Sequence, residues 1–163
     1  MIKFVNCLQK NLDRLTKLFF LIINLSYVTT VLSIVIQVIA RYVFNSPTAW
    51  SEELARLSFI WLAVLVFPIG IRTGSHIGFD MFKVYIGTLS KKAELILEII
   101  RYVLVTITLI IFAYNGFLIL PAGARQLTPA LSIKFSYVYS VVPIAMIFGI
   151  FCELERFLKN LLE

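Results

Sequence analysis

Long apolar runs alternate with short polar connectors along the chain, and this pattern predicts four membrane-spanning helices. The first run, residues 18–40, carries no charged residue and would form about 34 Å of helix at about 1.5 Å per residue. The other spans are predicted at about residues 50–71, 93–120 and 134–152. We therefore expect an all-α integral membrane protein in which residues 1–163 form a single four-helix domain.

Residues 1–17 precede the first run and show a different periodicity. Apolar residues recur at spacings of three and four, while the cations Lys3, Lys10, Arg14 and Lys17 occupy other faces. This pattern is typical of an amphipathic helix that lies flat in the membrane interface and contacts lipid headgroups. We therefore expect an N-terminal interfacial helix ahead of the first span.

The second span is predicted to begin within a polar cluster. Its uncharged part, residues 57–71, would be only about 22 Å long, which is too short to cross the hydrocarbon alone. The preceding turn, which carries Glu52, Glu53 and Arg56, must therefore lie close to the membrane. Because spacings of three and four bring side chains onto one helix face, Arg56 is predicted to reach both acids.

Two interpretations of this cluster remain open. It could be a solvated helix end that contains its own ion pair. Alternatively, it could belong to a network between helices or subunits that also includes Arg41 and the indole of Trp50, because charges close to the hydrocarbon need partners.

Other polar residues allow more local predictions. Asn24 and Gln37 in the first span are candidates for hydrogen bonds between helices, whereas the Ser and Thr residues there should bond to their own backbone carbonyls. His76 and Asp80 have the spacing of a helical pair, but the neighbouring glycines favour a structural loop. At the start of the third span, Glu94, Glu98 and Arg101 are spaced four and three residues apart, so we expect them to pair along their own helix at the water boundary.

The distribution of cations predicts the topology. Taken together, the N-terminal segment, the connector after the second span and the C-terminal segment contain ten Lys and Arg residues, against four on the other side: Arg41, Arg56, Arg125 and Lys134. The positive-inside rule then places both termini in the cytoplasm. The charged segment from Glu153 onward is accordingly expected to be a cytoplasmic tail.

Composition supports the membrane class and excludes several functions. The chain is 60% hydrophobic with a mean hydropathy of +0.93, and its net charge of +6 is explained by topology and anionic lipid rather than by nucleic acid. Cys7 and Cys152 lie at opposite ends of a chain that contains a single histidine. This inventory lacks the residues for a zinc site, a bis-histidine haem or a Ser-His-Asp set, so we expect neither a cofactor nor enzyme activity.

The stretch from residue 41 to residue 80 resembles the signature region of the DctQ-type small membrane subunits of TRAP (tripartite ATP-independent periplasmic) transporters. The resemblance also covers the four-helix plan. It implies that the partner interface, or a structural network behind it, involves the following residues: Arg41, Trp50, Glu52, Glu53, Arg56, Trp61, His76 and Asp80.

Membership of that family would imply a multi-pass protein of the bacterial inner membrane that takes part in the uptake of an organic acid, a sialic acid before a C4-dicarboxylate. Its partners would be a large membrane subunit, in a 1:1 heterodimer, and a periplasmic substrate-binding protein. Sodium and substrate would bind the large subunit, while the small subunit would widen the static scaffold for an elevator-type movement. The alternative is a self-associating four-helix protein, either an assembly factor or a small exporter. An exporter needs an acidic residue deep in a span, and the sequence predicts none.

Overall fold

The structure, a computed structural model, describes the backbone of residues 2–73 and 91–162 and the side chains of residues 9–73 and 96–159. The helices are α1 (Ile2–Tyr42), α2 (Ala49–Thr73), α4 (Lys91–Ala124), α5 (Phe135–Tyr139) and α6 (Val141–Leu162). Within the described ranges, four helical segments are long and apolar enough to cross a membrane, with α5 and α6 together forming the fourth. The predicted all-α fold with four spans is confirmed.

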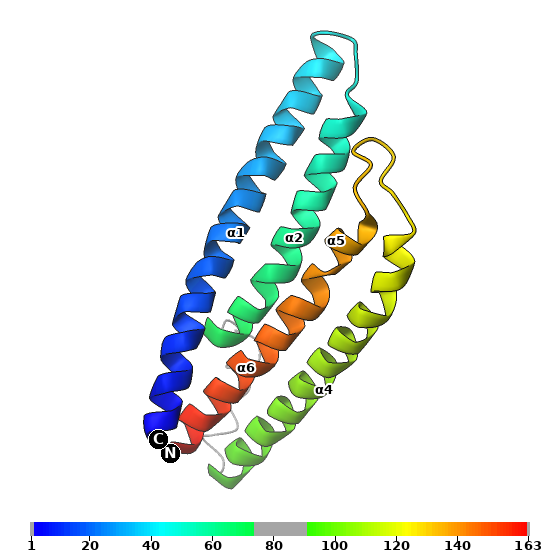
Figure 1. Cartoon of the computed structure of the whole chain (residues 1–163). Helices are drawn as coiled ribbons and strands as arrows, with labels where there is room; N and C mark the ends of the chain where they lie inside the picture. The colour runs from blue at the N-terminus through cyan, green and yellow to red at the C-terminus, as the bar shows by residue number, and fades with distance from the viewer. Residues whose placement is uncertain (1, 74–90, 163) are drawn as a thin grey trace.

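The helices stand in an open row in the order α1, α2, α6 and α4 (Figure 1). Helix α2 packs between α1 and α6, and α1 also contacts α6 directly. Helix α4 packs on the other side of α6, and its described backbone approaches neither α1 nor α2. Both chain termini lie at one end of the row (Figure 1), which we call the terminal end. The opposite end carries the connectors 43–48 and 125–134, and we call it the loop end.

This order explains which helices are buried. In the apolar part of each span, the buried share of residues is 44% for the segment containing α6 but 17% for α1 and for α4. Helix α1 packs through a single stripe that includes Leu12, Phe19 and Ile23, and near the terminal end the ring of Phe19 stacks on Phe148 with a centroid distance of 4.3 Å. The two outer helices therefore present most of their apolar surface to the surroundings.

The N-terminus differs from the prediction. Residues 2–42 form one continuous helix rather than a separate interfacial helix followed by a span. Leu12, expected to lie among lipid, is only 3% exposed and belongs to the same hydrophobic cluster as Cys152 of α6. Among the described side chains, the heptad-like packing stripe of α1 includes Leu12, which packs against the bundle rather than facing the interface.

The C-terminal half also differs in its boundaries. Helix α4 continues through Pro121 to Ala124, beyond the predicted end, because its last turn packs closely on α5 through Gly123. The fourth span is divided at Ser140, where Pro143 has no N–H to bond the carbonyl of residue 139. Helix α6 then continues to Leu162, so the expected tail is the last part of the packed bundle.

Candidate functional site

At the loop end, the first turn of α2 carries the polar cluster predicted from the sequence. Arg56 Nη2 lies 3.0 Å from Glu52 Oε1, which confirms the predicted pair. Gln37 of α1 donates to Glu52 Oε2 at 3.3 Å, so it makes the expected bond between helices. The side chains of Arg56 and Glu52 are 70% and 51% exposed. This pair therefore has the geometry of a solvated helix end.

Glu53 has a different role from its neighbour. Its carboxylate accepts the backbone N–H groups of Ala130 at 2.7 Å and of Leu131 at 3.3 Å, both in the connector between α4 and α5. Among the described residues it forms no ion pair with Arg56, which corrects the prediction that Arg56 would bind both acids. The reason is that Glu53 lies about 100° around the helix from Glu52, on the side of α2 that meets this connector.

The connector bound by Glu53 has its own internal hydrogen bonds. The N–H of Thr128 donates to the carbonyl of Ile133 at 2.9 Å, and the N–H of Ile133 donates to the Thr128 hydroxyl at 3.0 Å. Thr128 is buried, with 2% of its surface exposed. A cavity of about 250 Å³ between α2 and this connector is lined by Glu52, Glu53 and other residues of both segments. Glu53 therefore fixes a compact loop above the start of α2.

The remaining predicted site residues are not brought into this cluster. Arg41 and Trp50 are exposed, and in the part of the chain that the structure describes neither makes a polar contact with the acids. Trp61 is half-buried and packs against the hydrophobic core. His76 and Asp80 lie outside the described residues.

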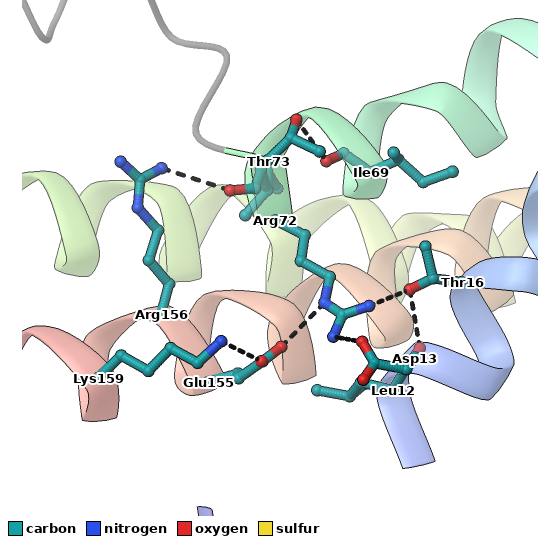
Figure 2. Close-up of polar contacts among 10 residues, drawn as sticks. Leu12, Asp13, Thr16, Ile69, Arg72, Thr73, Glu155, Arg156 and Lys159 are labelled. Carbon is teal, nitrogen blue, oxygen red and sulfur yellow. Dashed lines mark hydrogen bonds and ion pairs between the residues drawn. The ribbon is translucent and has the colours of Figure 1, made fainter. Parts of the chain in front are cut away.

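At the terminal end, Arg72 joins three helices. Figure 2 shows its side chain extending from the last turn of α2 towards α1 and α6. Its Nε donates to Glu155 Oε2 at 2.9 Å, Nη2 pairs with Asp13, and Nη1 donates to the Thr16 hydroxyl. That hydroxyl donates in turn to the carbonyl of Leu12 at 2.7 Å and is therefore free to accept from Arg72. We call Asp13, Arg72, Glu155 and Lys159 the Arg72 network.

The Arg72 network contains a buried carboxylate, which makes its ion pairs important for stability. The side chain of Glu155 is 2% exposed and that of Arg72 is 15% exposed, whereas Asp13 is 52% exposed. Lys159 supplies a second cation, with its Nζ 2.7 Å from Glu155 Oε1. A buried carboxylate is costly unless it is paired, and here two cations compensate it. The network therefore ties α1, α2 and α6 together at the terminal end.

A second buried ion pair joins the two helices at the other side of the row. Arg101 Nη1 of α4 lies 2.8 Å from Glu153 Oε1 of α6, and the two side chains are 7% and 0% exposed. The spacing within the third span had predicted a pairing of Arg101 along its own helix. The structure instead provides a partner on α6 that local spacing could not reveal.

The sequence analysis predicts neither the Arg72 network nor the Arg101–Glu153 pair, because it places the residues from Glu153 onward in a cytoplasmic tail. One pattern in the sequence nevertheless indicates that Glu155 is buried. The buried face of α6 follows positions 141, 145, 148 and 152 at spacings of four and three, and Glu155 continues this series. An acid in register with an apolar face indicates burial, and a buried acid requires a cation on a neighbouring helix.

These polar groups are suited to holding helices together. The described charges that are buried are paired between helices, and the described residues contain no group of three potential metal ligands. The arrangement therefore indicates a structural role for the polar clusters at the terminal end.

Comparison with known proteins identifies the family. Residues 30–163 match the family described as "Tripartite ATP-independent periplasmic transporters, DctQ component". The chain is 28% identical over 120 residues to the sialic acid TRAP transporter small permease protein SiaQ of Vibrio cholerae, a match that covers 74% of this chain and 68% of the relative. It is also 25% identical over 125 residues to a putative TRAP transporter small permease protein of Haemophilus influenzae, covering 77% and 74%.

A longer relative shows the same similarity within a larger polypeptide. The chain is 23% identical over 118 residues to the sialic acid TRAP transporter permease protein SiaT of Haemophilus influenzae, covering 72% of this chain but 19% of that protein.

The four apolar helical segments and the family match together show that this chain is a multi-pass inner membrane protein. The chain belongs to the DctQ family and is a small permease subunit of a TRAP transporter.

Proposed function

We propose that this small permease subunit extends and anchors the static scaffold of a larger elevator-type permease, with which it forms a 1:1 heterodimer. The observation that carries this proposal is the open row of helices, which has the shape of a wall rather than of a closed bundle around a central site (Figure 1). Such a wall can lengthen a neighbouring protein's scaffold while exposing its other surfaces to lipid.

The internal contacts of the row favour a rigid body. The Arg72 network holds α1, α2 and α6, and the Arg101–Glu153 pair holds α4 on α6. Along the same α4–α6 contact, a Cβ on Gly116 would lie 2.9 Å from Cδ of Pro143, so these helices are in close backbone contact. A rigid wall is what a transport domain requires as the reference against which it moves.

The longer relative supports the choice of partner. Only 19% of SiaT corresponds to this chain, so most of that permease has no counterpart here. Segments of one polypeptide stay close together. The part of SiaT that this chain does not match therefore corresponds to the separate large subunit that we propose as the partner. We propose that this large subunit carries the substrate and sodium sites and receives an organic acid from a periplasmic binding protein. Among acids we favour sialic acid, then C4-dicarboxylates, because two of the relatives are named for sialic acid.

Co-expression with the large permease tests the proposal. An affinity tag on this chain should recover the permease in a 1:1 ratio, measured by native mass spectrometry. In proteoliposomes the complex should take up a binding-protein-delivered acid only with an inward sodium gradient, and a potassium gradient serves as the control. Recovery of a homodimer without the permease would instead support the self-associating alternative.

A further inference from the structure

Asn24 of α1 is a polar residue that the fold leaves exposed inside the membrane. It lies within the uncharged stretch 18–40, about 8 Å along the helix from the middle of that stretch. Because the hydrocarbon extends about 15 Å to either side of the midplane, this position is within it. The exposed side chain of Asn24 therefore lies in a region that contains no water.

Comparable side chains on the outer helices have partners. Thr29 donates to the carbonyl of Leu25 at 2.8 Å, and Asn115 on α4 donates from Nδ2 to the carbonyl of Ile111 at 2.7 Å. Gln37 bonds to Glu52 of α2. Among the residues that the structure describes, Asn24 makes no hydrogen bond, although its carboxamide has both a donor and an acceptor to satisfy. Lipid tails supply neither partner.

The surface around Asn24 is suited to another helix. Phe20, Tyr27 and Val31 are 46%, 59% and 41% exposed, and together with Asn24 they are spaced four, three and four residues apart. This spacing forms a continuous stripe for helix packing. It lies next to the stripe of Leu12, Phe19 and Ile23 through which α1 packs against the rest of the chain. Helix α1 is at the edge of the row, so a helix can approach this face without displacing another element (Figure 1).

We propose that this α1 face, formed by Phe20, Asn24, Tyr27 and Val31, is the contact surface for a transmembrane helix of the large permease subunit. Asn24 bonds there to a polar group of that helix at the same depth. The inference rests on the proposed function and adds the surface and the anchoring residue. The large subunit is favoured over a second copy because SiaT carries the matching segment in one chain with a larger permease.

Site-specific photo-crosslinking in membranes tests the surface. Benzoylphenylalanine replaces Asn24, Tyr27 or Val31 in the co-expressed complex, and the controls carry it at Leu25 or Leu32, which are 60% and 56% exposed on a neighbouring face of α1. We expect an adduct with the mass of this chain plus the permease from the first set only. An adduct with a second copy of this chain, or permease adducts from the control positions alone, would overturn the assignment.

A matched pair of substitutions tests the role of Asn24 itself. Asn24→Leu should weaken retention of the permease by roughly three- to tenfold, the range expected for one hydrogen bond between membrane helices. Asn115→Leu should leave retention unchanged, because that amide bonds to its own backbone. Equal retention in both variants would show that Asn24 is not an anchor. If the unmodified chain recovered no permease, the proposed function would fail as well, whereas recovery with crosslinks on another face would reject this surface alone.

Discussion

Arg72 Nε lies 2.9 Å from Oε2 of Glu155, across 83 residues of sequence and between two different helices. This contact joins the end of α2 to the end of α6, and Asp13 extends it to α1 (Figure 2). A single guanidinium therefore connects the regions of both termini to the centre of the row.

Glu155→Gln should destabilise the protein strongly. The substitution removes a carboxylate that is 2% exposed and leaves Arg72 with a reduced set of partners in a largely buried position. Removal of one member of a buried pair costs about 3 to 5 kcal/mol, whereas an exposed partner contributes at most about 1 kcal/mol. Asp13→Asn, at a residue that is 52% exposed, is the matched control. The free energy of unfolding in mixed micelles should separate the two variants, and equal values would contradict the importance of burial.

Arg101 and Glu153 should contribute to the free energy of unfolding as a coupled pair. Arg101→Met or Glu153→Leu alone leaves one charge unpaired between α4 and α6 and should cost about 3 to 5 kcal/mol. The double variant replaces both charges with apolar groups of similar size, and its stability should lie within about 1 kcal/mol of the original or exceed it. A double-mutant cycle measures this coupling. Additive losses would mean that the two side chains act independently.

Gly116 should not tolerate a side chain, whereas Gly70 should. A Cβ at position 116 would lie 2.9 Å from Cδ of Pro143 and 3.1 Å from Val142, while a Cβ at position 70 would meet nothing within 4 Å. We expect Gly116→Ala to cost about 1 to 3 kcal/mol by overpacking. Gly70→Ala should be neutral or stabilising by up to about 1 kcal/mol through helix propensity. Thermal unfolding of the two variants in the same detergent provides the comparison, and a tolerant Gly116 would show that α4 can move away from α6.

Glu53 and Glu52 should differ despite being adjacent. Glu53→Ala removes the acceptor for the amides of Ala130 and Leu131, so these two amides should exchange hydrogen for deuterium faster. Of the contacts among described residues, Glu52→Ala breaks only an exposed pair with Arg56 and a bond from Gln37. Exchange in the connector between α4 and α5 should then remain as in the original protein. Mass spectrometry of peptides covering residues 126–135 measures the difference, and slow exchange in both variants would show that the loop does not depend on Glu53.

The sequence by itself determined the features that depend on neighbours along the chain. Four apolar runs of spanning length specified the number of membrane-spanning segments, and the four-residue spacing of Glu52 and Arg56 specified their ion pair. The sequence predicted that Gln37 would bond to another helix, but it did not identify Glu52 as the partner. These features follow from helix geometry, which is the same wherever the helix lies.

Only the tertiary structure decided which helix faces meet. Lipid tails are as apolar as leucine, so a packed face and a lipid-facing face of α1 or α4 have similar side chains, and hydrophobic periodicity does not distinguish them. The position of α6 between α2 and α4 gives Arg72 and Arg101 their buried partners. The same order places Glu53 beside a loop and leaves Asn24 exposed. The spatial order of the helices results from their mutual packing, and it is therefore absent from the local pattern of any one helix.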